Sequence, residues 1–221
     1  MLPCLVFEDE HLLVVNKPAG LNTHAPAPYA GEGLYDWLRH REPRWAALAI
    51  IHRLDKETSG LMVFGKTPLA NRSLTAQFAA RSVHKIYQLR TDRPVPASEQ
   101  VVSSGIARAG DHYVSSAEGE PAETLFCLLS DGLVQAQPHT GRTHQIRVHA
   151  AASGFPILGD TLYGGSAWPR VCLHAAELRF AHPASGELLR FNAPADFSAD
   201  ARQTLRTALI ELAWRLAVWQ R

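Results

Sequence analysis

The sequence has few cysteines, no long apolar run and little net charge. Its three cysteines, Cys4, Cys127 and Cys172, are far apart and form no CxxC pair, which argues against a disulfide framework or a zinc knuckle and fits a reducing cytosol. No apolar run approaches the ~18 residues that a membrane span needs. Acidic residues at positions 8–10 interrupt the N-terminus and argue against a signal peptide. We therefore expect a cytoplasmic protein with no membrane partner.

The composition is that of a soluble globular protein. Of the 221 residues, 46% are hydrophobic and 19% are charged. No repeat, low-complexity tract or linker interrupts the chain, so we expect a single domain over residues 1–221. The formal net charge is only +1, but residues 39–93 hold eleven Lys or Arg against four Asp or Glu. This local excess fits either a solvated face or a surface that binds a phosphate backbone.

Hydrophobic periodicity predicts alternating strands and helices. We expect strands at residues 5–7, 12–15, 46–51, 61–64, 83–91, 125–129, 133–137, 172–182 and 188–191, and helices at residues 33–40, 142–153 and after Thr67-Pro68. Residues 101–126 alternate weakly, and Gly105, Gly110 and Gly119 suggest hairpins there. Apolar residues recur every three or four positions over about residues 199–220, which predicts a terminal amphipathic helix that docks on the core.

One charged stretch, His52 to Gly60, lies between two short apolar runs. Charged residues at a strand end commonly build sites. In extended chain Arg53 and Asp55 would point the same way, and a neighbouring arginine favours an ionised carboxylate, suited to act as nucleophile or base. A structural ion pair that caps a turn would explain the same residues.

Two further stretches carry candidate functional residues. Arg147 lies between Ile146 and Val148 on a predicted helix that is too apolar for solvent alone. A buried arginine needs a carboxylate such as Asp55 or a ligand phosphate as its partner, unless its head snorkels to water. On the strand at residues 83–91, Lys85 and Tyr87 share a face. Tyr87 is either core packing or a platform on which a nucleobase stacks while Lys85 meets a phosphate.

Other patterns match known sites only formally. Residues 60–67 fit G-x4-G-K-[ST], but their apolar core, Leu-Met-Val-Phe, is typical of a buried strand and not of a phosphate-binding loop. His139, His144 and His149 are five residues apart, a spacing that does not place metal ligands on one helix face. Ser59 lacks the glycine of a nucleophile elbow. A glycosidase-like pair of Asp55 and Glu57 stays open as an alternative.

Taken together, six ordered stretches resemble the RluA family of pseudouridine synthases. They are Asn16 to Gly20, His52 to Gly60, Lys85 to Tyr87, Thr140 to His149, Pro156 to Gly164 and Leu173 to Ala175. The resemblance implies an α+β pseudouridine synthase fold, with a central mixed, largely antiparallel sheet flanked by helices and an active cleft across the sheet. It also implies an isomerase that needs no cofactor and no metal. The resemblance begins near residue 5, so we expect a compact member without an N-terminal S4-type domain.

By the same resemblance, Asp55 is the catalytic carboxylate, Tyr87 the active-site tyrosine and Arg147 the arginine that pairs with the aspartate. Arg53 would fill the space that a flipped uridine leaves, and Lys85, Arg142 and His144 would contact RNA. The expected partner is structured RNA, a ribosomal RNA or tRNA stem-loop, and the expected state is a monomer. A non-catalytic RNA-binding module on the same fold is the alternative.

Overall fold

The computed structural model describes residues 4–25 and 33–198. Its helices are α1 (Leu34–Arg41), α2 (Pro68–Ala79) and α3 (Gln145–Ala152), with 3-10 turns η1 (Pro43–Trp45) and η2 (Thr161–Tyr163). The strands are β1 (Leu5–Glu8), β2 (Leu12–Lys17), β3 (Ala49–Ile50), β4 (Ser59–Gly65), β5 (His84–Arg90), β6 (Gln100–Ala109), β7 (His112–Ser115), β8 (Glu120–Ser130), β9 (Leu133–Pro138), β10 (Leu173–Ala181) and β11 (Leu188–Asn192).

These strands form a single sheet. Its order is β1-β2-β4-β10-β5-β9-β8-β6-β7, with β11 paired to β10 and β3 paired to β4. Only the β4–β10 pair is parallel, and the other pairs are antiparallel. The expected α+β architecture with a mixed, largely antiparallel sheet is therefore confirmed.

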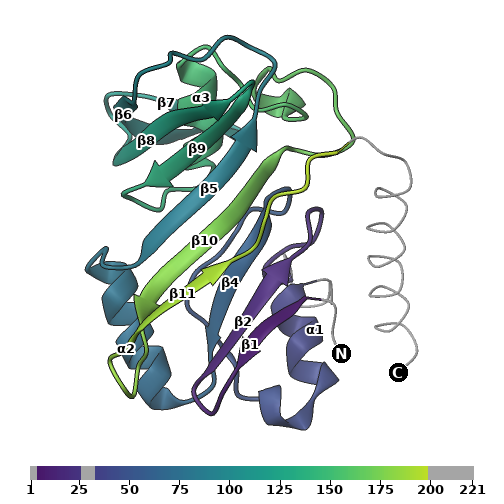
Figure 1. Cartoon of the computed structure of the whole chain (residues 1–221), viewed down its shortest axis with the longest axis vertical. Coiled ribbons are helices and arrows are strands. Elements are labelled where there is room, and N and C mark those ends of the chain that lie inside the picture. The colour runs from purple at the N-terminus through teal and green to yellow at the C-terminus, as the bar shows by residue number, and fades with distance from the viewer. Residues whose placement is uncertain (1–3, 26–32, 199–221) are drawn as a thin grey trace.

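The long central strands β5 and β10 join two halves of the molecule (Figure 1). In the view of Figure 1, α1 and α2 lie with β1, β2 and β4 in the lower half, and α3 lies with β6–β9 in the upper half. Among the buried apolar clusters, one core surrounds Trp45 and Phe64 in the lower half and another surrounds Phe126 and Phe155 in the upper half. Tyr87 on β5 packs against both cores, so it marks the junction between the halves.

Local sequence signals explain several element ends. The Thr67 hydroxyl accepts a hydrogen bond from the Ala70 amide and caps α2, and Pro68 occupies the first turn. Gly132, with φ 62°, forms the turn between β8 and β9, as the Asp131-Gly132 pair predicts. In the stretch that formally matches a phosphate-binding loop, the apolar part lies in the fully buried strand β4.

Two expectations about strands were wrong. Gly105 lies inside β6 and not in a turn, because β6 passes so close to the next hairpin that a side chain at residue 105 would come within 2.4 Å of the Ser116 carbonyl. Of the expected strand at residues 46–51, only β3, Ala49–Ile50, pairs with β4. Trp45, in the short 3-10 turn before it, is fully buried and anchors that segment in the core. The predicted helix at residues 199–220 lies outside the described residues.

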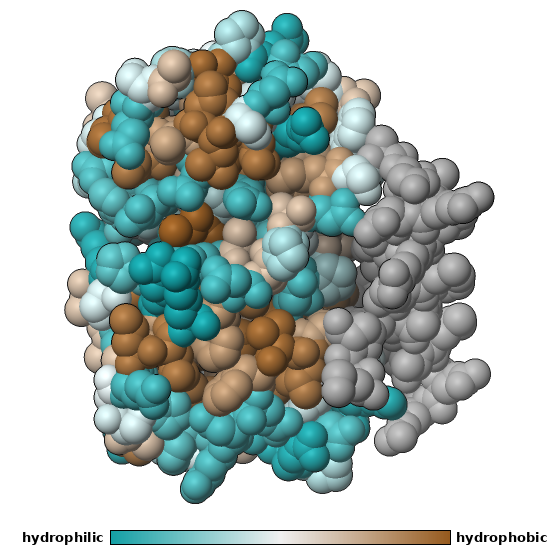
Figure 2. Space-filling model, in the orientation of Figure 1, coloured by the Kyte–Doolittle hydropathy of each residue, from teal (hydrophilic) through white to brown (hydrophobic). Residues whose placement is uncertain are grey.

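Hydrophobic residues on the face shown in Figure 2 gather in two regions, one over β8 and β9 and one over the lower ends of β2 and β10. Hydrophilic residues separate the two regions across the middle of this face. Within residues 4–25 and 33–198, no helix is both long and apolar enough to cross a membrane.

Candidate active site

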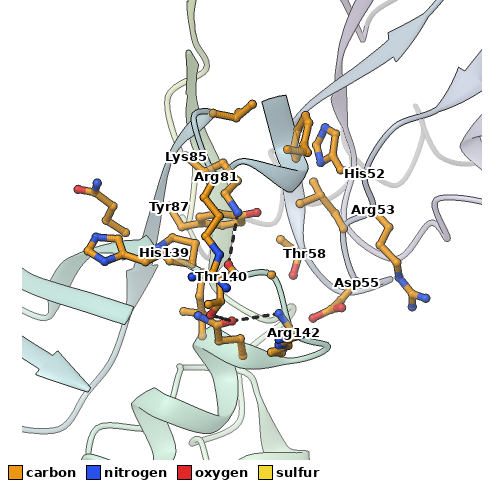
Figure 3. A pocket seen from close by; sticks show the side chains of 18 of the residues that line it. His52, Arg53, Asp55, Thr58, Arg81, Lys85, Tyr87, His139, Thr140 and Arg142 are labelled. Atoms are coloured by element: carbon orange, nitrogen blue, oxygen red, sulfur yellow. Dashed lines mark hydrogen bonds between the residues drawn. The ribbon is translucent and has the colours of Figure 1, made fainter. Parts of the chain in front are cut away.

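A pocket of about 650 Å³ opens at the junction of the two halves (Figure 3). Its walls come from the loop between β3 and β4, the end of α2 with the start of β5, and the segment that joins β9 to α3. The volume suits a small ligand or a single nucleotide. All seven residues expected at the site line it: Arg53, Asp55, Lys85, Tyr87, Arg142, His144 and Arg147.

The loop that carries Asp55 is fixed by the segment after β2. The buried Thr23 hydroxyl donates to the Leu54 carbonyl at 2.8 Å and accepts from the Leu54 amide at 3.1 Å. The fully buried Lys17 ammonium donates to the carbonyls of Leu21 and Lys56, at 2.7 and 3.2 Å. The amide and carbonyl of Leu54 and the carbonyl of Lys56 therefore all have hydrogen-bond partners. These bonds hold the backbone on both sides of Asp55.

The loop continues into β4 through a backbone contact that only glycine allows. Gly60 has φ 120°, and a side chain there would come within 2.4 Å of the Ala175 backbone. This close approach permits the parallel pairing of β4 with β10. It explains why a glycine ends the charged stretch.

Asp55 lies in the pocket with its side chain 17% exposed. Burial raises the pKa of the Asp55 carboxyl, and the charges of His144, Arg147 and Arg53 oppose this rise, in that order. The expectation that Arg53 points with Asp55 was wrong, because Figure 3 shows the Arg53 guanidinium directed away from the carboxylate. The loop is not an extended strand, so the alternation of faces does not apply to it.

Arg147 pairs most closely with Asp160 and not with Asp55. Its Nε and Nη2 donate to the two oxygens of Asp160 at 2.6 and 2.8 Å, and both side chains are at most 3% exposed. Nη1 lies 3.4 Å from Glu57 and 3.9 Å from Asp55. Burial alone disfavours the guanidinium charge, but the bonds to Asp160 raise the pKa of Arg147. The expectation of a buried arginine with a carboxylate partner is confirmed, with a different carboxylate as the main partner.

Tyr163 connects Arg147 to His144. The Arg147 guanidinium lies 4.9 Å from the centroid of the Tyr163 ring, a cation–π distance. The Tyr163 hydroxyl is 2.7 Å from His144 Nδ1 and accepts from the Tyr113 amide at 3.1 Å. Because that hydroxyl already accepts from an amide, it can donate to His144 Nδ1, which leaves the proton of a neutral imidazole on Nε2.

The helix expected from residue 142 begins only at Gln145. His144 has φ 56°, a left-handed conformation that a helix cannot contain. Arg142 and His144 therefore lie on the loop that borders the pocket. Burial lowers the pKa of His144, while the negative charge of Asp55 opposes this effect.

Tyr87 and Lys85 extend into the pocket from β5 (Figure 3). The residues opposite Tyr87 on the adjacent strands are the alanines Ala136 and Ala175. The tyrosine lines the pocket and also packs against the two apolar cores. Burial, and then the charge of Asp55, raises the pKa of Tyr87, so its hydroxyl stays protonated at neutral pH. Lys85 Nζ lies 3.4 Å from the Thr140 carbonyl, and burial lowers the pKa of its ammonium.

Arg142 is already paired within the protein. Its Nη1 lies 2.5 Å from Glu120, and its Nε donates to the Pro121 carbonyl at 3.2 Å. The pair is exposed, so it is weak enough for a phosphate to displace.

Comparisons with known proteins point to one family. The profile of the RNA pseudouridylate synthase family matches residues 11–152. The chain is 39% identical over 211 residues to ribosomal large subunit pseudouridine synthase C of Yersinia pestis, covering 87% of this chain and 66% of the relative. It is 38% identical over 216 residues to ribosomal large subunit pseudouridine synthase D of Zymomonas mobilis, covering 86% and 68%. The structure of human RNA pseudouridylate synthase domain containing 1 superposes with a TM-score of 0.72, at 26% identity, covering 93% and 94%.

The chain belongs to the RNA pseudouridylate synthase family. It spans about two thirds of the length of the curated relatives that it matches. Family membership favours pseudouridine chemistry over the glycosidase alternative that Asp55 and Glu57 left open. The three histidines considered as metal ligands each have a different partner: His139 contacts Glu123, His144 contacts Tyr163 and His149 contacts Thr124.

The sequence pointed to no role for three of the supporting residues. Asp160 and Tyr163 belong to a glycine-rich stretch that resembles the family, but no residue type or spacing in the sequence links either of them to Arg147. Thr23 lies in a loop with no periodic pattern. The left-handed backbone of Arg81, at the end of α2, had no signal at all, because glycine usually marks such a position.

Proposed function

We propose that this protein is an RNA pseudouridine synthase with Asp55 as its catalytic carboxylate. In this isomerisation the glycosidic bond of a uridine breaks, the base rotates, and C5 of the base is joined to C1′ of the ribose. One observation carries the proposal: the Asp55 carboxylate lies in a nucleotide-sized pocket with Tyr87 on one wall and Arg147 on another. The family membership supports it.

In this proposal each pocket residue has a different role in the reaction. The target uridine must leave its stack to enter the pocket, at a cost of a few kcal/mol. Tyr87 then offers an aromatic face and a protonated hydroxyl to the base. To Arg53, which lines the pocket and is exposed, we assign the space that the uridine leaves in the RNA. Asp55 acts as an anion, either by attacking the substrate or by removing the 2′ proton of the ribose.

Arg147 and His144 supply positive charge or hydrogen bonds beside Asp55, and they favour its ionised form. The Arg147 charge is largely compensated by Asp160, so Asp55 keeps more basicity than a tight ion pair would leave it. This arrangement favours a carboxylate that accepts a proton or attacks carbon.

The proposed substrate is ribosomal RNA of the large subunit, because the relatives named above bear that substrate in their names. A tRNA stem-loop is the second candidate. The test incubates the purified protein with transcripts of large-subunit ribosomal RNA and of total tRNA, and maps pseudouridine by carbodiimide modification and primer extension. We expect new pseudouridine with the wild type and none with Asp55→Ala, while RNA binding by the variant persists.

A non-catalytic RNA-binding module would bind the same transcripts without forming pseudouridine. Wild-type protein that binds RNA tightly but leaves every uridine unchanged would favour that alternative. Full activity of Asp55→Ala would overturn the role given to Asp55. Comparing pseudouridines in total RNA from cells with and without this gene would then name the modified position.

A further inference from the structure

Helix α2 ends in a Schellman motif whose usual glycine is replaced by Arg81. The Ser82 amide donates to the Gln77 carbonyl at 3.0 Å, and the Arg81 amide donates to the Phe78 carbonyl at 3.2 Å. In this motif the residue after the C-cap has a left-handed backbone, and Arg81 has φ 56°. Glycine adopts this conformation without strain, whereas a residue with a β-carbon does so at a cost.

Backbone strain of this kind is concentrated at the pocket. Within residues 4–25 and 33–198, only Arg81 and His144 combine a side chain with a positive φ. Both line the pocket, Arg81 from the end of α2 and His144 from the loop before α3. Strained backbone that persists in a folded protein tends to occur at functional sites, and the coincidence of both residues at one pocket points to function and not to chance.

The Arg81 side chain is available to a ligand. It is exposed and makes no hydrogen bond or ion pair with any residue of the described ranges. Figure 3 shows it extending from the end of α2 into the pocket beside Lys85. Lys85 is half-buried and directed at the Thr140 carbonyl, and Arg142 is paired with Glu120. Arg81 therefore offers a guanidinium at the pocket that no group of residues 4–25 and 33–198 bonds.

A purely structural reading of Arg81 is possible and makes a different prediction. A positive charge near the C-terminus of a helix interacts favourably with the helix dipole. If that were the role of Arg81, glycine at this position would remove a favourable interaction, and the thermal stability of the protein would fall. If the side chain serves a ligand, glycine would relieve strain and stability would not fall.

We propose that Arg81 binds a phosphate of the RNA strand next to the flipped uridine, and that its left-handed backbone directs the guanidinium into the pocket. A planar guanidinium suits phosphate because it can donate two parallel hydrogen bonds. This inference rests on the proposed function, since it requires RNA as the ligand. It adds a phosphate contact from α2 to the sites predicted from the sequence.

The test measures binding of a labelled large-subunit ribosomal RNA transcript at several salt concentrations for the wild type, Arg81→Gly and Arg81→Lys. For Arg81→Gly we expect an affinity loss of about tenfold, a decrease of about 0.7–0.9 in the slope of log affinity against log salt, and an unchanged or higher Tm. Arg81→Lys should keep the salt slope. The matched control is Arg72→Ala, on the exposed side of α2 outside the pocket, which should keep affinity, slope and Tm.

Wild-type affinity and slope in Arg81→Gly would overturn the inference, as would an equal loss in Arg72→Ala. A lower Tm in Arg81→Gly would support the structural role instead. Binding is read separately from pseudouridine formation, so the two proposals fail differently. A wild type that binds through Arg81 but forms no pseudouridine refutes only the proposed function, and pseudouridine formation with no effect of Arg81 on binding refutes only this inference. A wild type that does not bind RNA refutes both.

Discussion

The guanidinium of Arg147 donates two hydrogen bonds to Asp160, at 2.6 and 2.8 Å, while its distance to Asp55 is 3.9 Å. Asp160 is 1% exposed and Asp55 is 17% exposed. The buried ion pair thus lies behind the pocket. Asp55 lies nearest to Nη1 of Arg147, the nitrogen that does not bond Asp160. A carboxylate held in this way is close to a cation without being fully neutralised by it.

Arg147 and Asp160 should shift the pH dependence of activity in opposite directions. Arg147→Ala removes a charge that favours ionised Asp55, so the acid limb of kcat should move to higher pH, with a loss of about 10²-fold or more at neutral pH. Asp160→Asn leaves the Arg147 charge less compensated, so the acid limb should move to lower pH. Measuring kcat against pH for both variants checks this. Shifts in the same direction would contradict the arrangement.

Arg147→Ala and Glu57→Gln should differ in their effect on stability. Arg147→Ala leaves the buried Asp160 carboxylate without its cationic partner. Breaking such a pair lowers the free energy of unfolding by about 3–5 kcal/mol. Glu57→Gln removes only a partly exposed partner of Arg147 and should cost at most about 1 kcal/mol. Urea unfolding of both proteins measures the difference. A large loss of unfolding free energy in Glu57→Gln would show that the ion pair of Arg147 with Glu57 also stabilises the fold.

Asp55→Asn should stabilise the protein at neutral pH while it abolishes activity. Burial raises the pKa of Asp55 in the folded state, so the stability linked to this group is complete at low pH and is lost as the pH rises through the folded-state pKa. An uncharged amide avoids that loss, and Arg147 keeps Asp160 as its partner. The gain in Tm over the wild type should therefore grow as the pH rises from acidic to neutral.

The control for this prediction is Glu118→Gln, an exposed carboxylate outside the pocket. It should leave the difference in Tm from the wild type independent of pH. A Tm of Asp55→Asn below that of the wild type at neutral pH would mean that the Asp55 carboxylate contributes to stability through contacts with its cations, and would contradict the prediction.

Local signals in the sequence predicted elements better than they predicted contacts. The Thr67-Pro68 cap and the Asp131-Gly132 turn are decided by residues adjacent in the chain, and both are present. The parallel pairing of β4 with β10 depends on Gly60 meeting Ala175, more than a hundred residues away. The periodicity of hydrophobic residues does not show which distant residues come into contact. The architecture followed from the family resemblance and not from the pattern of elements.

At the candidate site, too, the sequence predicted single residues better than it predicted their contacts. Asp55, Tyr87 and Arg147 were predicted because charge, exposure and motif identify them one at a time, and the structure brings them to one pocket. The choice of Asp160 over Asp55 as the main partner of Arg147 depends on how η2 packs against α3. The left-handed backbone of His144, which delays the start of the predicted helix, accompanies tertiary contacts with Tyr113 and Tyr163.

Thr23 should control activity through the position of the Asp55 loop. Its hydroxyl makes two hydrogen bonds with the backbone of Leu54, at 2.8 and 3.1 Å. Thr23→Val keeps the shape but leaves a buried amide and carbonyl unsatisfied, so we expect a stability loss of about 1–3 kcal/mol and a lower kcat. Thr23→Ser keeps the hydroxyl and should behave like the wild type. RNA affinity should not change in either variant, and a fall in affinity with unchanged kcat would contradict a positioning role.

His174 should make the stability of the protein depend on pH in the acidic range. It is 4% exposed, lies within hydrogen-bond distance of the Ser59 hydroxyl at 2.7 Å and donates from Nε2 to the Ala193 carbonyl at 3.0 Å. Burial, and then the charge of Arg170, lowers the pKa of His174 to about 4. The unfolded chain therefore binds a proton at higher pH than the folded protein does, and stability falls as the pH decreases from about 6.5 to about 4.

The expected loss over that range is about 3 kcal/mol, because each unit of pKa shift corresponds to about 1.4 kcal/mol. His174→Gln cannot take up this proton, so its unfolding free energy in urea should decrease less than that of the wild type on acidification. His24→Gln changes an exposed histidine and should follow the wild-type curve. Since Ser59 directly follows the Asp55 loop, wild-type activity should decline with stability in this pH range. If the unfolding free energies of the wild type and His174→Gln depended on pH in the same way, another buried group would be responsible.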